Sequence, residues 1–404
     1  MYLHGLTIQE LFMKPSMKPL AAILAICSTT SALAAWPPVV PENKLQVLTC
    51  GPGLESESGH IMNTNSPART VAGCWNKRIA YGGAATLAFQ RADSMSNSTT
   101  SETFLSLRTL SLFTDVTLNQ DMALHLMLNQ NATLTNNMPT GDAELGDNLN
   151  IDEAYLAIRN VARPGMYIKA GKSFTPFGNY KDPYPVVYNL NQGYVQAANT
   201  NLMLGFASDA GFNASAFIFE NETSQDWNEY GFRMGFERGK STQGLSWLLN
   251  ASYVDNYAAL NGTMGSNPIT NANQDQYAYD IQAGLGLGHA KLGVEYFRVG
   301  GNVLSTGLST TAEPKVVSIN LAYDFIANNR NIEAHILFEK ASDASAMQSL
   351  AFSAANQAEK HLNLGLTVMV DPHVEVKMDY HNFTPFDSSL DNQIQVVTQL
   401  RLAF

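Results

Sequence analysis

The chain has 404 residues and a formal net charge of −11, and only 15% of its residues are charged. Its mean hydropathy is −0.11, and it contains no run of about 18 apolar residues, which argues against helices that cross a bilayer. The acidic balance argues against nucleic acid as a partner and against a polybasic grip on anionic lipid. Few charges together with many Asn, Gly and Tyr residues are typical of alternating membrane strands.

Residues 1–34 predict a secretory signal peptide. Lys14 and Lys18 precede an apolar stretch over residues 20–27, and Ala32-Leu33-Ala34 matches the small-x-small pattern of a cleavage site. The first twelve residues carry no Lys or Arg, so Met13 and Met17 are alternative starts. The mature chain is expected to begin at Ala35 or close to it.

Residues 35–77 are rich in Pro and Gly and show no strand pattern. This composition predicts an N-terminal segment that lies in the periplasm or in a lumen, and it is far too short for the plug domain of a TonB-dependent transporter. Cys27 leaves with the signal peptide, so Cys50 and Cys74 remain as a pair in an oxidising compartment. The even count predicts a disulfide between them.

From residue 78 onward, apolar and polar side chains alternate with the period of two that a strand requires. About sixteen such segments can be drawn. They cover residues 79–89, 104–118, 122–132, 151–159, 166–172, 201–207, 212–219, 230–237, 245–254, 277–287, 290–299, 316–325, 332–339, 362–370, 374–383 and 394–404. Short and long links alternate between them, as in a barrel with both termini in the periplasm.

The last segment has one apolar and one polar face and ends the chain on an aromatic residue. Val396, Leu400 and Phe404 share one face, and Gln399 and Arg401 point the other way. This strand resembles the closing strand of bacterial outer-membrane barrels. A soluble β-sandwich has the same period, but its outward faces carry many more charges. The sequence therefore predicts an all-β, transmembrane, antiparallel up-and-down barrel over residues 78–404, set in the lipid of the bacterial outer membrane.

A barrel of about sixteen strands leaves an aqueous lumen, so its inward side chains matter. Side chains of both signs across a pore screen solutes by charge and size. For any single residue, however, a salt bridge within the wall is the simpler interpretation. The inward candidates are Arg108, His125, Glu153, Arg159, Lys169, Arg233, Glu237, Lys291, Glu295, Asp324, Glu333, His335, Glu375, Lys377, Asp379, His381 and Arg401.

The most unusual stretch is a predicted hairpin followed by a link rich in Pro, Gly and aromatic residues. Its first strand contains Asp152-Glu153-Ala154-Tyr155, and its second runs into Gly171-Lys172 and then Pro176-Phe177-Gly178. From about Ile151 to Pro185 this arrangement resembles the LbtU-type siderophore porins, a family of outer-membrane barrels without a plug. The resemblance implies uptake of a ferric siderophore, or of iron in another form.

Candidate loop or constriction residues in this link are Lys172, Pro176, Phe177, Gly178 and Tyr180. A structural turn at a constriction or interface explains Pro176 to Gly178 as well as a ligand contact does. No binding residue of the family can be transferred to a position of this chain.

Two other functions compete with iron uptake. The same fold serves as a diffusion porin for another small solute, such as a sugar or a carboxylate. Some outer-membrane barrels are hydrolases, and His125, His335 and His381 could each reach a catalytic partner. No nucleophile elbow and no metal-spaced histidine pair occurs in the sequence. We therefore expect no enzyme activity, no cofactor and no resident metal.

Overall fold

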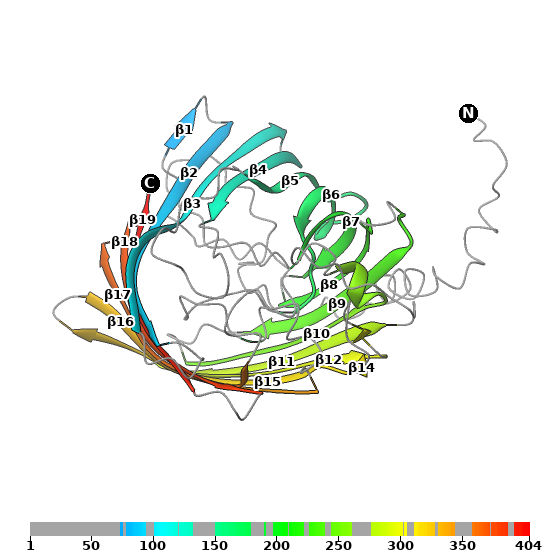
Figure 1. Cartoon of the computed structure of the whole chain (residues 1–404). Coiled ribbons are helices and arrows are strands. Elements are labelled where there is room, and N and C mark those ends of the chain that lie inside the picture. Colours follow the sequence, from blue (N-terminus) through cyan, green and yellow to red (C-terminus); the bar gives the residue numbers. More distant parts are fainter. Residues whose placement is uncertain are drawn as a thin grey trace, which may run out of the picture.

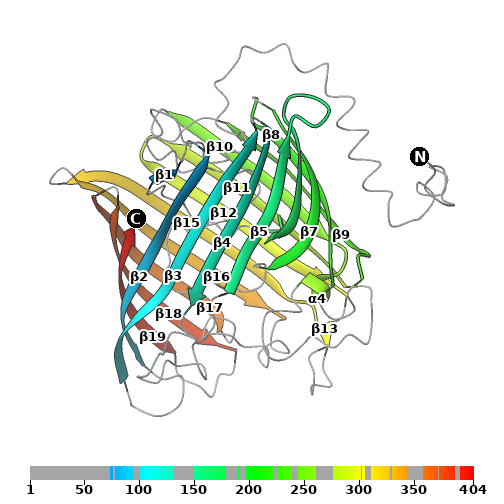
Figure 2. The same cartoon turned by 90° about the horizontal axis from the view of Figure 1, so that it is seen from above.

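The computed structural model describes residues 73–75, 78–93, 101–119, 121–131, 150–178, 190, 197–208, 210–221, 226–238, 244–260, 276–301, 303–304, 311–327, 330–343, 358–371, 373–386 and 392–404. Figure 1 looks into a ring of strands, and Figure 2, turned by 90°, shows these strands running obliquely across the wall.

The ring is a closed antiparallel barrel of 16 strands, as the sequence predicted. Each strand pairs with its neighbour in the sequence, and the last strand pairs with the first. The strands are β2 (Ile79–Asp93), β3 (Ser101–Asn119), β4 (Met122–Asn131), β5 (Asn150–Arg159), β6 (Met166–Phe174), β7 (Ala198–Ala207), β8 (Phe212–Phe219), β9 (Glu229–Arg238), β10 (Leu245–Val254), β11 (Tyr277–Leu287), β12 (Ala290–Gly300), β15 (Lys315–Ala327), β16 (Arg330–Ser342), β17 (Ala358–Asp371), β18 (Val374–Pro385) and β19 (Gln393–Ala403).

The C-terminal aromatic residue helps to close the ring. Leu400 of β19 lies opposite Leu87 of β2. The backbone N–H of Gly83 donates to the carbonyl of Phe404 at 2.6 Å, and the N–H of Phe404 donates to the carbonyl of Gly83 at 2.9 Å. Because a closed barrel has no free strand edge, every wall strand has two hydrogen-bonded neighbours, as a strand inside a bilayer requires.

In the part of the chain that the structure describes, three short strands and the helical turn α4 (Tyr257–Leu260) accompany the barrel. β1 (Gly73–Trp75) pairs with the start of β2, and β13 (Val303–Leu304) pairs with β14 (Thr311–Ala312). The strand β1 was not predicted, because three residues are too few to show an alternating pattern. The turn α4 follows β10. No helix in the part of the chain that the structure describes is long and apolar enough to cross a membrane.

The predicted disulfide remains a prediction. Cys74 lies in β1, opposite Ala80 of β2, whereas Cys50 lies outside the described residues. If the bond forms, mass spectrometry of thiol-alkylated but unreduced protein finds neither cysteine labelled. Two alkylated cysteines in freshly purified protein would contradict the pairing.

The links between strands alternate in length around the barrel, as predicted. At one end, which we call the short-turn end, strands are joined within a few residues, as between Leu287 and Ala290 or between Ala327 and Arg330. At the other, long-link end, the chain between strands is longer, as from residue 131 to residue 150. This asymmetry is typical of outer-membrane barrels.

The two faces of the wall are the reverse of those of a soluble protein. Large apolar side chains cover the outside, where Leu249, Leu285 and Leu321 are each half exposed. Polar side chains lie on the inner face, where His335 and Asn363 are buried. Burial of polar groups and exposure of apolar groups is what a bilayer outside and a polar lumen inside require. This outer face and the barrel fold place the protein in the bacterial outer membrane.

An apolar cluster lies inside the barrel near the long-link end, and the sequence did not predict it. Inward side chains of several strands there are aromatic or branched and fully buried. They pack with side chains of α4 and of the link between β6 and β7. Its members include Phe177, Leu190, Phe217, Phe219, Tyr257, Phe297 and Phe383.

Candidate functional site

We call the link between β6 and β7, residues 175–197, the lumen loop, because Phe177, Gly178 and Leu190 of its described part contact the inner face of the barrel. Its described residues are 175–178, 190 and 197. At its base, the N–H of Thr175 donates to the carbonyl of Ala197 at 3.0 Å, which joins the two ends of the loop. The sequence predicted a long link here, with Pro176, Phe177 and Gly178 as candidate loop or constriction residues.

The first part of the lumen loop is fixed to the inner face of β9, β10 and β12 by packing and by hydrogen bonds. Phe177 is fully buried and meets Phe297 of β12 edge to face, with ring centroids 6.1 Å apart. The N–H of Gly178 donates to Oγ of Ser252 at 3.0 Å. Nη1 of Arg233 donates to the carbonyl of Gly178 at 3.1 Å. The loop therefore leaves β6 and contacts β9, β10 and β12, three to six strands further round the ring.

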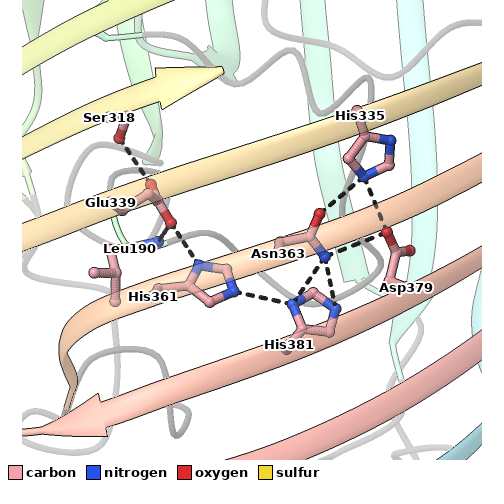
Figure 3. Close-up of polar contacts among 8 residues, drawn as sticks. All are labelled: Leu190, Ser318, His335, Glu339, His361, Asn363, Asp379 and His381. Carbon is pink, nitrogen blue, oxygen red and sulfur yellow. Dashed lines mark hydrogen bonds and ion pairs between the residues drawn. The ribbon is translucent and has the colours of Figure 1, made fainter. Parts of the chain in front are cut away.

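A second anchor holds the loop at Leu190, against β16 (Figure 3). The N–H of Leu190 donates to Oε2 of Glu339 at 2.8 Å. Glu339 is fully buried, and its carboxylate also accepts bonds from Oγ of Ser318 at 2.8 Å and from Nδ1 of His361 at 2.7 Å. Three donors satisfy this buried charge, so its burial is compatible with a stable fold.

The wall behind Glu339 is a chain of buried polar side chains on β16, β17 and β18 (Figure 3). Nε2 of His361 lies 3.0 Å from Nδ1 of His381. Both rings stack with Phe383, and the ring of His361 lies 4.3 Å from that of Phe383. His361 and Phe383 lie opposite each other on neighbouring strands, and stacked cross-strand pairs of this kind stabilise a sheet.

The chain continues through Asn363 to the next histidine. Asn363 contacts the ring of His381, and Nε2 of His335 lies 2.8 Å from Oδ1 of Asn363 and 3.1 Å from Oδ1 of Asp379. In the described part of the chain, no group of three His, Cys, Asp or Glu side chains is arranged to hold a metal ion. These side chains form hydrogen bonds with one another, and they therefore hold this part of the barrel wall in place.

A second buried charged group lies on β3, β4, β5 and β6. Nδ1 of His125 lies 2.5 Å from Oδ1 of Asp115, and its Nε2 lies 3.7 Å from Oε2 of Glu153. Nζ of Lys169 lies 4.8 Å from the centre of the Tyr155 ring. Acidic and basic side chains thus lie close together in a buried part of the inner face, where charges interact more strongly than in water.

The short-turn end carries charges that are partly open to water. Nζ of Lys291 lies 2.8 Å from a carboxylate oxygen of both Asp324 and Glu333. On β18, Nζ of Lys377 lies 3.3 Å from Oε1 of Glu375. This end of the lumen therefore combines paired charges with a surplus carboxylate beside Lys291.

The structure places most of the predicted inward residues on the inner face. Glu339, His361, Asn363, Ser252 and Ser318 were not named as candidate site residues, although each has the inward parity of its strand. The side chain of Arg108 and all of Tyr180 lie outside the described residues. Inner-face positions follow for His125, Glu153, Arg159, Lys169, Arg233, Glu237, Lys291, Glu295, Asp324, Glu333, His335, Glu375, Lys377, Asp379, His381 and Arg401 from the strand registers.

Two residues of the Gly-Lys motif have structural explanations. Gly171 lies in β6 with a φ of 132°, and a Cβ there would lie 2.3 Å from the carbonyl oxygen of Ala154. Only glycine fits this close approach. Lys172 lies in β6 on the opposite face from Lys169, and not in the lumen loop. Lys172 is thus wrongly predicted as a loop residue.

Comparison with known proteins supports the fold. No model of a known protein family matches the chain, and no curated protein matches it either. Among solved structures, Salmonella typhi OmpF in complex with daunomycin is similar at a TM-score of 0.57 and 13% identity, over 82% of this chain and 99% of that one.

Two further porins show the same likeness. Pseudomonas putida OprB has a TM-score of 0.56 and 10% identity, over 81% of this chain and 95% of that one. An anion-selective porin from Comamonas acidovorans has a TM-score of 0.53 and 12% identity, over 81% and 99%. The chain therefore has the fold of the outer-membrane porins, a closed barrel of 16 strands.

Proposed function

We propose that the protein is a diffusion porin, which lets small hydrophilic solutes cross the outer membrane through the lumen. The observation that carries the proposal is the lumen loop, anchored to β9 and β10 at Gly178 and to β16 at Leu190, inside a barrel with a polar inner face. A loop held across a wide barrel narrows the passage without needing a separate plug domain. The porin fold of the solved neighbours supports a channel.

A ferric siderophore is the second candidate solute. The stretch that resembles the siderophore porins, from Ile151 to Pro185, forms β5, β6 and the start of the lumen loop. Phe177 of this stretch contacts β12, and Gly178 contacts β10. Phe177 and Gly178, which help to hold the loop that narrows the lumen, thus lie within the stretch that resembles the siderophore porins. A solute preference shared with that family would arise there. We propose no catalytic role for the inner-face histidines.

Swelling of liposomes that contain the full-length protein tests the proposal. We expect fast swelling in monosaccharides and slower swelling as the sugar grows, because the anchored loop limits the passage. Folded protein that migrates faster unheated than heated on a gel, yet gives no swelling in any sugar, would contradict it.

A second arm of the experiment separates the two solutes. Entry of a labelled ferric siderophore is measured in the same liposomes. Saturable entry that unlabelled ferric siderophore blocks, with little swelling in sugars, would favour the siderophore candidate. Release of fatty acid from the lipid would favour a hydrolase instead.

A further inference from the structure

We propose that the channel prefers cations, and that the inner face of β9 to β16 determines this preference. The inference rests on the proposed porin function and adds the class of solute. We call this part of the inner face the acidic half. Between the level of the lumen loop and the short-turn end, it carries two cationic side chains, Arg233 and Lys291. It carries six carboxylates there, those of Glu237, Asp280, Glu295, Asp324, Glu333 and Glu339.

The rest of the inner face is balanced. Among the described side chains of the remaining strands, the four carboxylates of Asp115, Glu153, Glu375 and Asp379 are matched in number by the four cations of Arg159, Lys169, Lys377 and Arg401. Glu375 and Lys377 lie within 3.3 Å of each other, and Glu375 also lies opposite Arg401 in the register. The excess of negative charge therefore belongs to the acidic half.

The two cations of the acidic half do not cancel this excess. Lys291 is shared by Asp324 and Glu333, each at 2.8 Å, so the trio keeps a net negative charge. Arg233 is directed at the carbonyl of Gly178 in the lumen loop. Glu295, on the same strand as Lys291, accepts a hydrogen bond from the neutral amide of Gln282 at 2.9 Å.

The side chains of Lys291, Asp324 and Glu333 are partly exposed to water in the lumen. The side chain of Lys291 is 33% exposed, that of Asp324 27% and that of Glu333 18%. Charges of one sign in a lumen with low-dielectric walls raise the local concentration of ions of the opposite sign. The carboxylates need not bind a cation for this effect, since the sign of the potential along the wall is sufficient.

The reversal potential of the full-length protein in a planar bilayer with a KCl gradient tests this inference. We expect K⁺ to permeate better than Cl⁻, with the preference weakening between about 0.1 M and 1 M salt, as the screening length falls from about 10 Å to about 3 Å. The variant D324N/E333Q, alone and with E295Q, is expected to lower the K⁺/Cl⁻ permeability ratio by about twofold or more. K291Q is expected to raise it.

Glu359→Gln is the matched control, because Glu359 pairs with Lys360 at the long-link end, on β17 and outside the acidic half. It is expected to leave the ratio unchanged. A wild-type channel that prefers Cl⁻ or prefers neither ion overturns the inference and leaves the porin function standing. So does a cation preference that the acidic-half variants do not change. Folded protein that conducts no ions contradicts the porin function itself.

Discussion

Replacing Glu339 by alanine is expected to detach the lumen loop from β16 and to raise the conductance of the channel. The carboxylate is fully buried and accepts hydrogen bonds from Leu190, Ser318 and His361. Its removal leaves these three donors without their acceptor, and breaking a buried charged network of this kind costs about 3–5 kcal/mol. The barrel keeps its backbone pairing, so the cost falls mainly on the docking of the loop.

Glu339→Gln is the matched control for that experiment. Its amide oxygen can accept from Leu190 and His361, and its NH₂ group can donate to the hydroxyl of Ser318. Single-channel recordings should therefore show wild-type conductance for the glutamine variant and larger, noisier conductance for the alanine variant. Equal conductance in the alanine variant and the wild type would mean that the anchor at Leu190 does not restrict the passage.

Replacing Phe177 by alanine is expected to loosen the first anchor of the same loop. Phe177 is fully buried and packs edge to face on Phe297. Truncating a buried phenylalanine costs about 3–5 kcal/mol, from lost burial and from the cavity that remains. We expect larger sugars to enter liposomes faster, while the heat-dependent gel migration of the barrel is retained.

Phe338→Ala serves as the comparison for Phe177→Ala. Phe338 lies on β16 with the parity of the outer face and is 42% exposed. Its truncation removes an aromatic ring of the same size without touching the lumen loop. Similar changes in sugar entry for both variants would show that the effect comes from the wall as a whole and not from the loop.

The barrel itself could be predicted from the sequence because the bilayer imposes a pattern on every strand. Leu362, Leu364 and Leu366 alternate with Asn363 and Gly365 in the sequence, and the structure places Asn363 in the buried inner wall and leaves Leu364 42% exposed outside. Strand ends were less well predicted. β7 begins at Ala198, before the predicted residue 201, because its first residues pair with β6 but are not alternately apolar.

The path of the lumen loop could not be predicted, because it depends on contacts between distant residues. Leu190 and Glu339 are 149 positions apart, and no local pattern links them. The sequence does contain one indication of an inward segment, namely aromatic residues at inward positions of the strands. Phe217 and Phe219 lie on the face that otherwise carries Asn213 and Ser215. Aromatic side chains on a polar inner face indicate that something packs against them there.

Ion conductance of the purified full-length protein in a planar lipid bilayer tests the central claim most directly. The claim is that the lumen remains a water-filled path past the anchored loop. The account predicts stepwise openings of uniform size at neutral pH, with protein whose heat-dependent gel migration shows a folded barrel. Folded protein that inserts into the bilayer and gives no conductance steps would contradict the account.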